Sequence, residues 1–278
     1  MSLLSRSQLR IALAPDRVVL LRTEGLLRQR ITATQVLPVV EGAEGRPWEP
    51  ALQVLEQALP GFAGKGEAVT LVLSSHFCRF LPIPALPTLA SEEEEAAFAR
   101  HTFREVYGEA AHDWTVRLSG DSPARPRLGA AIDQALLDGA RRASKAAGLK
   151  LVSVQPFLMT AFNAWHRTLI QQPGWFALYE AGRLCLCLIT KDGVQSVRGV
   201  PVSADWRAEL PLLVQRESNL QVLEGQEIPS AGHVFHPSQT SPSQVRGLPA
   251  NLQALTLSEH ALAASPQPEQ AAMALVGL

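Results

Sequence analysis

Strand-like runs of apolar residues open both halves of the chain. In the first half, residues 9–21 read as a strand, a tight turn and a second strand, and residues 31–36 supply a third strand. A leucine stripe over 49–59 then predicts a helix, and the apolar run 68–73 predicts a buried, parallel strand. Strand-strand-strand-helix-strand is the core order of a ribonuclease H-like unit.

A compact subdomain is predicted for residues 76–154, with the order strand-helix-strand-strand-helix-strand. Its first helix begins after the N-cap residue Ser91, and Glu94 at the third helical position completes a capping box. Glu92 to Glu95 place negative charge at the positive end of the helix dipole, so we expect this helix start to be exposed. Asp133 can cap the second helix.

The second half repeats the opening meander. Residues 156–170 predict a helix that is apolar on nearly every side and therefore lies between packed layers. Residues 175–200 predict three strands, with Asp192-Gly193 as a hairpin turn. The remaining predicted elements are a helix over 206–223, apolar runs at 234–235 and 252–257, and a final helix over 268–276.

The composition is that of a globular protein. At 278 residues the chain suits one large domain or two modest lobes, and 46% hydrophobic residues is too many for a disordered chain. The formal charge of -1 provides no global field for nucleic acid or anionic lipid. Cys78, Cys185 and Cys187 form no CxxC pair, which favours a reducing compartment. The chain has no signal peptide and no apolar run of about 18 to 20 residues, so we expect a soluble protein.

Four features of the chain resemble the cytoplasmic actin-like proteins of type IV pilus and type II secretion assembly. This group includes PilM, the cytoplasmic domain of GspL and MshI-like proteins. The duplicated meander is similar to the start of each lobe in an actin-like protein. The other three features are a proline-marked strand with an acidic helix start and an Asp-led strand (81–98 and 113–114), a Gly-Leu step before a strand that ends in Gln-Pro (148–156), and a closing helix of small residues (270–278).

The resemblance implies an α/β, actin-like (ribonuclease H-like) two-lobed fold with an inserted αβ subdomain and a reduced second lobe. The second lobe is expected to be reduced because only a short stretch separates its meander from Gly232, where ATP-binding relatives place a larger subdomain. The expected division is 1–75 for the first lobe, 76–154 for the inserted subdomain, 155–172 for a spine helix shared between the lobes, and 173–278 for the second lobe.

The turns that hold phosphate in active members of this group are altered here. Active members carry an Asp-x-Gly-Ser/Thr turn in the first hairpin, whereas residues 14–17 read Ala-Pro-Asp-Arg, and Pro15 removes a backbone amide. The second turn, residues 179–182, brings the bulk of tyrosine and the charge of glutamate. Residues 232–238 lack the double glycine of an adenosine turn. We therefore predict no enzyme activity, no cofactor, and no catalytic, cofactor-binding or metal residues.

Two clusters contain residue types that metal or acid–base sites use. His233 and His236 have a spacing that zinc often uses, but residues three apart on a strand point to opposite faces. Glu92 to Glu95 could combine with His101 or His112, although nothing in the sequence fixes a third ligand. No G-x-S-x-G or Walker A sequence is present, so a hydrolase or P-loop enzyme has no positive support.

Three functions remain open from the sequence. The leading hypothesis is a non-catalytic cytoplasmic scaffold of a pilus or secretion assembly. Its first lobe and inserted subdomain would bind the cytoplasmic tail of an inner-membrane protein at the inner-membrane face. The second is a weak ATP-binding switch, in which Asp16 would coordinate magnesium through water, although turn chemistry alone also favours aspartate there. The third is a small-molecule kinase-like enzyme, which glycine-rich turns or an aspartate in the cleft would have favoured.

Overall fold

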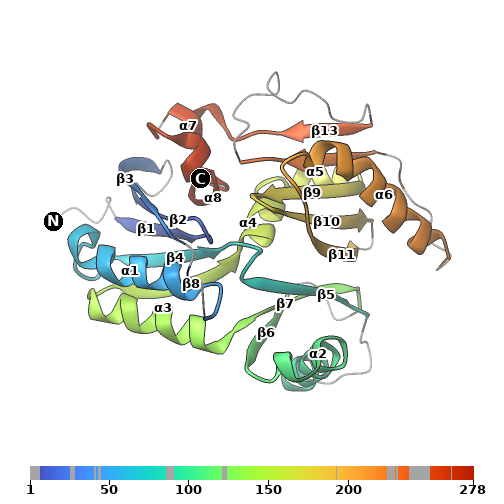
Figure 1. Cartoon of the computed structure of the whole chain (residues 1–278), viewed down its shortest axis with the longest axis horizontal. Coiled ribbons are helices and arrows are strands. Elements are labelled where there is room, and N and C mark those ends of the chain that lie inside the picture. Colours follow the sequence, from blue (N-terminus) through green and yellow to red (C-terminus); the bar gives the residue numbers. More distant parts are fainter. Residues whose placement is uncertain are drawn as a thin grey trace. The chain divides into compact units, whose positions relative to one another are not determined.

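The computed structural model places most of the chain in three β-sheets and the helices that pack on them (Figure 1). Two compact units result, one from residues 1–78, 132–164 and 257–278, the other from residues 79–131 and 165–256. The structure describes residues 7–25, 29–40, 42, 45–85, 91–120, 124–191, 193–223, 229, 231–237, 251–263 and 265–278. Asp192 and Ser238, which entered the sequence predictions, lie outside these described residues.

The first sheet has five strands in the order β3-β2-β1-β4-β8. The first three strands are antiparallel neighbours, while β4 is parallel to β1, and β8 is parallel to β4. This is the meander, helix and parallel strand that the sequence predicts. The strands are β1 (Gln8–Leu13), β2 (Arg17–Glu24), β3 (Arg30–Pro38), β4 (Ala68–Leu73) and β8 (Lys150–Pro156).

Helices cover both faces of this sheet. On one face α1 (Glu49–Phe62) packs against α3 (Gln134–Ala146), and the two helices lie side by side in Figure 1. On the other face α4 (Phe157–Ala164) contacts β4 and β8, and α8 (Pro268–Leu275) contacts the meander. The predicted stripe of α1 is buried as expected, and its helix continues through Pro60 for two further residues.

The second sheet repeats the first. Its order is β11-β10-β9-β12-β13, with the same antiparallel and parallel pairings at the same places. The two predicted hairpins, 9–21 and 176–186, therefore occupy equivalent positions in two similar lobes, and this prediction is confirmed. The strands are β9 (Gly174–Glu180), β10 (Arg183–Thr190), β11 (Gly193–Pro201), β12 (Gly232–Phe235) and β13 (Leu252–Leu255).

One long helix, α6 (Trp206–Leu223), follows the second meander, as predicted. Its first residue joins Trp175 and Leu186 in the core of the second lobe. All three cysteines are free and buried, as expected for small apolar residues. A short helix, α7 (Glu259–Ala263), precedes α8, and none of the described helices is long and apolar enough to cross a membrane.

A three-stranded sheet in the order β5-β7-β6 forms the core of the inserted subdomain. Ile83, Phe103 and Ala131 are buried between this sheet and α2. The elements are β5 (Cys78–Ile83), α2 (Glu92–Tyr107), a short 3-10 turn η1 (Gly108–Ala111), β6 (Trp114–Leu118) and β7 (Arg127–Asp133).

The start of α2 is capped as predicted but is only partly exposed. The Ser91 hydroxyl accepts a hydrogen bond from the Glu94 amide at 3.2 Å, which confirms the N-cap. Glu95, however, is buried and pairs with buried Arg127 at 2.9 Å. The expectation of an exposed acidic run is thus wrong for its last member, because the helical turn carries that side chain inward to a cation on β7.

The structure groups α3 and β8 differently from the sequence prediction. We expected residues 133–154 to close the inserted subdomain, but β8 pairs with β4 in the first sheet and α3 packs on α1. A short apolar strand carries no local signal for which sheet it joins, because its pattern is the same beside any parallel neighbour.

The predicted helix over 156–170 is two helices. After α4, Trp165 adopts φ -110° and ψ 17°, and α5 (His166–Gln171) begins. The Trp165 ring lies 4.6 Å from the ring of Phe235 at the end of β12. The helix therefore breaks where an aromatic side chain is held by a distant ring, with neither proline nor glycine at the break.

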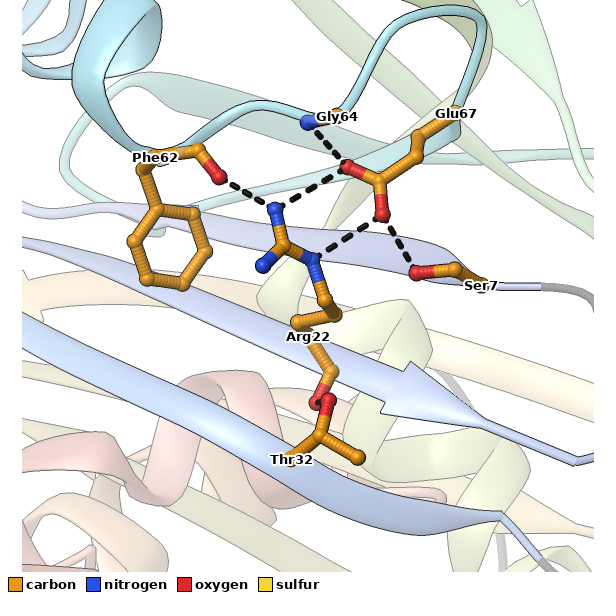
Figure 2. Close-up of polar contacts among 6 residues, drawn as sticks. All are labelled: Ser7, Arg22, Thr32, Phe62, Gly64 and Glu67. Atoms are coloured by element: carbon orange, nitrogen blue, oxygen red, sulfur yellow. Dashed lines mark hydrogen bonds and ion pairs between the residues drawn. The ribbon is translucent and has the colours of Figure 1, made fainter.

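A partly buried ion pair joins four segments of the first lobe (Figure 2). The Arg22 guanidinium donates to both carboxylate oxygens of Glu67, at 2.9 and 3.2 Å, and to the carbonyl of Phe62. The Glu67 carboxylate also accepts from the Gly64 amide at 2.6 Å and from the Ser7 hydroxyl. This network links the meander to the end of α1 and to the loop that enters β4.

Replacing Glu67 with glutamine should destabilise the first lobe. Burial alone would raise the pKa of Glu67, but the hydrogen bonds from Ser7, Gly64 and Arg22 outweigh it and leave the pKa below its ordinary value. We expect Glu67→Gln to lose about 2 kcal/mol of unfolding free energy at pH 7, measured by urea denaturation.

The matched control is Glu56→Gln on the exposed side of α1, which should change stability by less than about 0.5 kcal/mol. The advantage of the wild type should be present above about pH 4.3, the ordinary pKa of glutamate, and should vanish as the pH falls through the lowered pKa. Equal urea midpoints for wild type and Glu67→Gln at pH 7 would contradict this account.

Candidate functional site

In each lobe, a ligand site is expected at the edge of the sheet where the parallel strands have their carboxyl ends. In open α/β sheets, ligands bind beyond the carboxyl ends of parallel strands. In the first lobe, β1 and β4 end there, and the hairpin turn 14–17 follows β1. In the second lobe, β9 and β12 end there, and the turn after Glu180 follows β9. These are the two hairpin turns whose sequences differ from the phosphate turns of active actin-like proteins.

The first turn uses its polar groups internally. The Ala14 amide donates to the Arg17 carbonyl at 3.0 Å, and Pro15 has no amide hydrogen to offer. The Asp16 carbonyl accepts from the Val39 amide at 2.9 Å, and its carboxylate accepts from the Arg17 Nε at 3.0 Å. A phosphate cradle needs consecutive outward amides, so this turn is poorly suited to hold one. The carboxylate considered for magnesium is already paired with a cation from its own hairpin.

The second turn places side chains at positions where a phosphate would need exposed backbone amides. Glu180 is buried at the end of β9, and Gly182 takes φ 75° to close the turn. The Gly182 carbonyl accepts from the Val202 amide at 3.1 Å, which fastens the turn to the end of the meander. A buried acidic residue beside this turn disfavours an incoming phosphate by charge repulsion.

Three rings stack at this edge of the second lobe. The ring of Tyr179 lies 4.6 Å from His236 and 4.7 Å from Trp206, and the Trp206 and His236 rings are 5.3 Å apart. The interplanar angles of 10° to 22° make all three contacts stacked. The guanidinium of Arg207 lies over Trp206, 4.6 Å from the ring centroid. We call Tyr179, Trp206 and His236 the aromatic stack; Trp206 also belongs to the buried core of this lobe, and Tyr179 packs against that core.

His236 is a neutral member of the aromatic stack. Burial, aided by the charge of Arg207, lowers its pKa to about 4. The imidazole is therefore uncharged near pH 7 and packs as an aromatic ring.

The residues considered for metal or acid–base chemistry are not gathered in one place. His233 is buried within β12, whereas His236 lies beyond the end of that strand in the aromatic stack. His101 pairs with Glu105 at 3.3 Å, and His112 pairs with Asp113 at 3.0 Å. Within the described part of the chain, no group of three or more His, Cys, Asp or Glu side chains is placed to hold a metal ion.

Sequence reasoning identified Tyr179 as an obstacle but missed its two partners. Trp206 begins a helix and His236 follows a strand, and neither position has a spacing relation to the hairpin. These partners could have been found only from the strand order. The parallel neighbours β9 and β12 must end side by side, which brings the residues at their ends together.

Comparison with known proteins identifies the fold of the chain. No protein-family model matches the chain, and no curated protein matches it in sequence. Among solved structures, it is similar to the PilM–PilN type IV pilus biogenesis complex, with a TM-score of 0.65 and 17% identity over 96% of each chain. This chain has an actin-like fold.

Two further structures agree. One is the cytoplasmic domain of EpsL, an inner-membrane component of the type II secretion system of Vibrio cholerae, with a TM-score of 0.56 and 12% identity over 98% of this chain and 96% of that one. The other is a Bacteroides thetaiotaomicron protein of unknown function with an actin-like ATPase fold, with a TM-score of 0.56 and 10% identity over 96% and 95% of the chains. The predicted fold class and the resemblance to PilM-like proteins are confirmed at the level of structure.

Because the folded protein holds His236 in its uncharged form, we expect the protein to lose stability in mild acid. Unfolded histidine titrates near pH 6.5, and the folded pKa is about 4. The unfolded state therefore binds an extra proton as the pH falls from about 6.5 towards 4, and the unfolding free energy should drop by about 1 to 2 kcal/mol across that range.

The variant that tests this effect is His236→Phe, which keeps an aromatic ring in the stack without a titrating group. It should show a shallower decline of unfolding free energy between pH 6.5 and 4.5 than the wild type, measured by urea denaturation. His101→Gln, at an exposed helix position, should follow the wild type. Parallel pH profiles for wild type and His236→Phe would show that His236 is not buried in its neutral form.

Proposed function

We propose that this chain is a non-catalytic scaffold that binds the cytoplasmic tail of an inner-membrane protein in a type IV pilus or type II secretion-like assembly. The observation that carries the proposal is the aromatic stack, which lies near the carboxyl ends of β9 and β12, beside the turn where an actin-like ATPase would hold phosphate. The fold is retained while the groups needed to hold a nucleotide are replaced.

Ring stacking stabilises the arrangement of side chains at this place in the second lobe. Each stacked aromatic pair contributes about 0.5 to 1.5 kcal/mol beyond the area it buries, and Tyr179, Trp206 and His236 make three such contacts. A phosphate at the turn after β9 would approach the buried Glu180. In the first lobe it would meet a turn in which the Asp16 carboxylate is already paired with Arg17.

The similar structures supply the class of partner. The PilM structure is a complex with PilN, and EpsL is an inner-membrane component of a secretion system. Function does not follow from fold alone, so the partner class is part of the proposal. We place the chain in the cytoplasm, at the inner-membrane face.

Open sheet edges offer a means of docking in the first lobe and the inserted subdomain. An extended peptide can add to such an edge through main-chain hydrogen bonds. β8 is interrupted by a register shift beside exposed Val152, and β5 contains Pro82, which lacks an amide hydrogen. The outer strands β3 and β6 have no proline before their last residue, so we assign docking to one of these two edges.

The test uses synthetic peptides from the cytoplasmic ends of single-span membrane proteins encoded beside this gene. One peptide should bind the full chain with a micromolar Kd in fluorescence anisotropy, because ordering a flexible tail opposes binding. A scrambled peptide should not bind, and millimolar Mg-ATP should leave the Kd unchanged. Bound peptide should slow hydrogen exchange of amides in β3 or β6.

Two results would remove the proposal. Failure of every such peptide to bind would leave the scaffold without a partner of this class. Binding that requires Mg-ATP would support the nucleotide switch instead. If bound peptide slowed hydrogen exchange only in other elements, the proposed class of partner would stand, but docking at β3 or β6 would be rejected.

A further inference from the structure

Lysine side chains gather at one end of the first lobe. Lys65 lies in the loop that enters β4, Lys145 lies in the last turn of α3, and Lys150 begins β8. All three side chains are exposed, and the chain has no other lysine except Lys191, in the second lobe. We call Lys65, Lys145 and Lys150 the lysine end.

Backbone hydrogen bonds hold the segments of the lysine end together. The Gly66 amide donates to the Gly148 carbonyl at 2.8 Å, and the Lys150 amide donates to the Glu67 carbonyl at 2.9 Å. A methyl group added at Gly148 would lie 4.0 Å from the Lys65 Cγ, so these two residues are neighbours. The loop before β4 and the connection from α3 to β8 therefore form one continuous surface.

The lysine end lies opposite the edge of the first sheet where a ligand site is expected. In the strand register, Ala68 pairs with Gln8 on one side and with Lys150 on the other, so β1, β4 and β8 begin together. Their carboxyl ends meet at the other edge, where the turn 14–17 follows β1. A partner at the lysine end would therefore not cover that turn.

The cations at this end of the lobe are exposed and form no ion pairs with the protein. Among the residues that the structure describes, the three lysines pair with no carboxylate, and neither does Arg142 on the exposed side of α3. Arg142 lies three residues before Lys145, so both side chains project from one face of the helix. These charges are available to an anionic partner.

Carboxylates on the neighbouring elements do not balance these cations. In the described parts of β2, α1, α3 and the loop before β4, the carboxylates nearest this end are Glu24, Glu56, Glu67 and Asp138. Asp138 is paired with Arg141 at 3.1 Å, and Glu67 is paired with Arg22 at 2.9 Å. Glu24 and Glu56 remain to set against Arg142 and the three lysines, so this end carries a positive surplus.

The formal charge of -1 for the whole chain does not cancel this local surplus. Exposed charges farther apart than about 10 Å are largely screened from one another in salt, so each face of the molecule acts by itself. Lysine ammonium groups are compact charges on flexible stems, which suit many mobile phosphates better than one fixed, planar anion. The lysine end therefore fits a surface of mobile phosphate headgroups.

Nucleic acid is a less suitable polyanion for this surface. Single strands are held by cations together with exposed aromatic rings on which the bases stack. Phe62 is the aromatic residue nearest to Lys65 in the sequence, and the Arg22 guanidinium lies over its ring, 5.1 Å from the centroid. That ring is thus already covered by a group of the protein.

We propose that the lysine end rests on the anionic phospholipid headgroups of a membrane, without insertion into the bilayer. The choice of a membrane as the anionic partner rests on the proposed function, which places the chain at the inner-membrane face. The cytoplasmic leaflet is negatively charged, and basic residues within a Debye length of its surface are attracted to it. This contact orients the first lobe with the turn 14–17 away from the bilayer.

The β3 edge, one of the two proposed docking edges, begins at the same end of the sheet. Arg30 at the start of β3 pairs with Glu24, and Thr23 pairs with Gln8 at the start of β1. A tail that emerges from the bilayer therefore meets the first residues of β3 when the lysine end touches the membrane. Membrane contact and peptide docking at β3 are thus compatible.

The test is co-sedimentation of the full chain with large lipid vesicles. Vesicles of phosphatidylglycerol and phosphatidylethanolamine should bind the chain saturably, and vesicles of phosphatidylcholine alone should not. Binding to the anionic vesicles should weaken as NaCl rises from about 50 to about 300 mM, because salt screens the headgroup charge. Equal binding to both kinds of vesicle, or binding to neither, would overturn the proposal.

Removal of the three lysine charges should weaken this binding strongly. The triple variant Lys65→Gln, Lys145→Gln, Lys150→Gln should bind anionic vesicles at least about tenfold more weakly, since each cation near an anionic surface contributes about fivefold to the affinity. Its urea midpoint should stay near the wild-type value, because all three side chains are exposed. Unchanged vesicle binding by this variant would overturn the proposal.

The matched control removes the same amount of charge elsewhere. The variant Arg100→Gln, Arg104→Gln, Arg125→Gln changes exposed arginines of the inserted subdomain and has the same net charge as the lysine variant. It should bind anionic vesicles like the wild type. An equal loss of binding in both variants would show that net charge alone governs binding, which would contradict the assignment to the lysine end.

The tail peptide separates this inference from the proposed function. The lysine variant should bind the peptide with the wild-type Kd, because neither proposed docking edge contains a substituted residue. Peptide binding without vesicle binding would overturn the membrane contact and leave the proposed function intact, whereas vesicle binding without binding of any tail peptide would do the reverse. Tighter binding to a short DNA duplex than to anionic vesicles would also overturn the assignment to a membrane.

Discussion

In each lobe, the first strand pairs with its hairpin partner on one side and with a later, parallel strand on the other. This pairing, β1 with β4 and β9 with β12, fixes the arrangement of the whole lobe. Parallel strands end at the same edge, so the hairpin turn and the residue after the later strand must lie together. Whatever side chains stand at these positions decide whether the edge holds a ligand.

Here those positions hold side chains that bind one another. In the second lobe, Tyr179 from the hairpin reaches His236 after β12, and Trp206 from α6 completes the stack. In the first lobe, Asp16 is paired with Arg17 of the same turn. The sheets are stabilised by buried apolar strands and main-chain pairing. Neither depends on which side chains stand in the turns. The architecture can therefore persist after the turns lose their affinity for phosphate.

The sequence predicted the elements whose signals are local. The two meanders follow from strand-like runs of apolar residues separated by tight turns, and the start of α2 follows from Ser91 and Glu94. It did not predict that Glu95 is buried, because its partner Arg127 lies far along the chain. The joining of β8 to the first sheet and the break at Trp165 likewise depend on distant contacts. The aromatic stack combines residues from three separate parts of the chain, so it can be predicted only once the strand order is known.

The central proposal is that this chain does not bind nucleotide although its fold is actin-like. Its most direct test is calorimetric titration of the full chain with Mg-ATP to millimolar concentration, with thermal melting of the same samples. The account predicts no saturable heat and no change in Tm, whereas a ligand at one hundred times its Kd would stabilise the fold by about 2.7 kcal/mol. A saturable, magnesium-dependent rise in Tm that is lost in Asp16→Ala would contradict it.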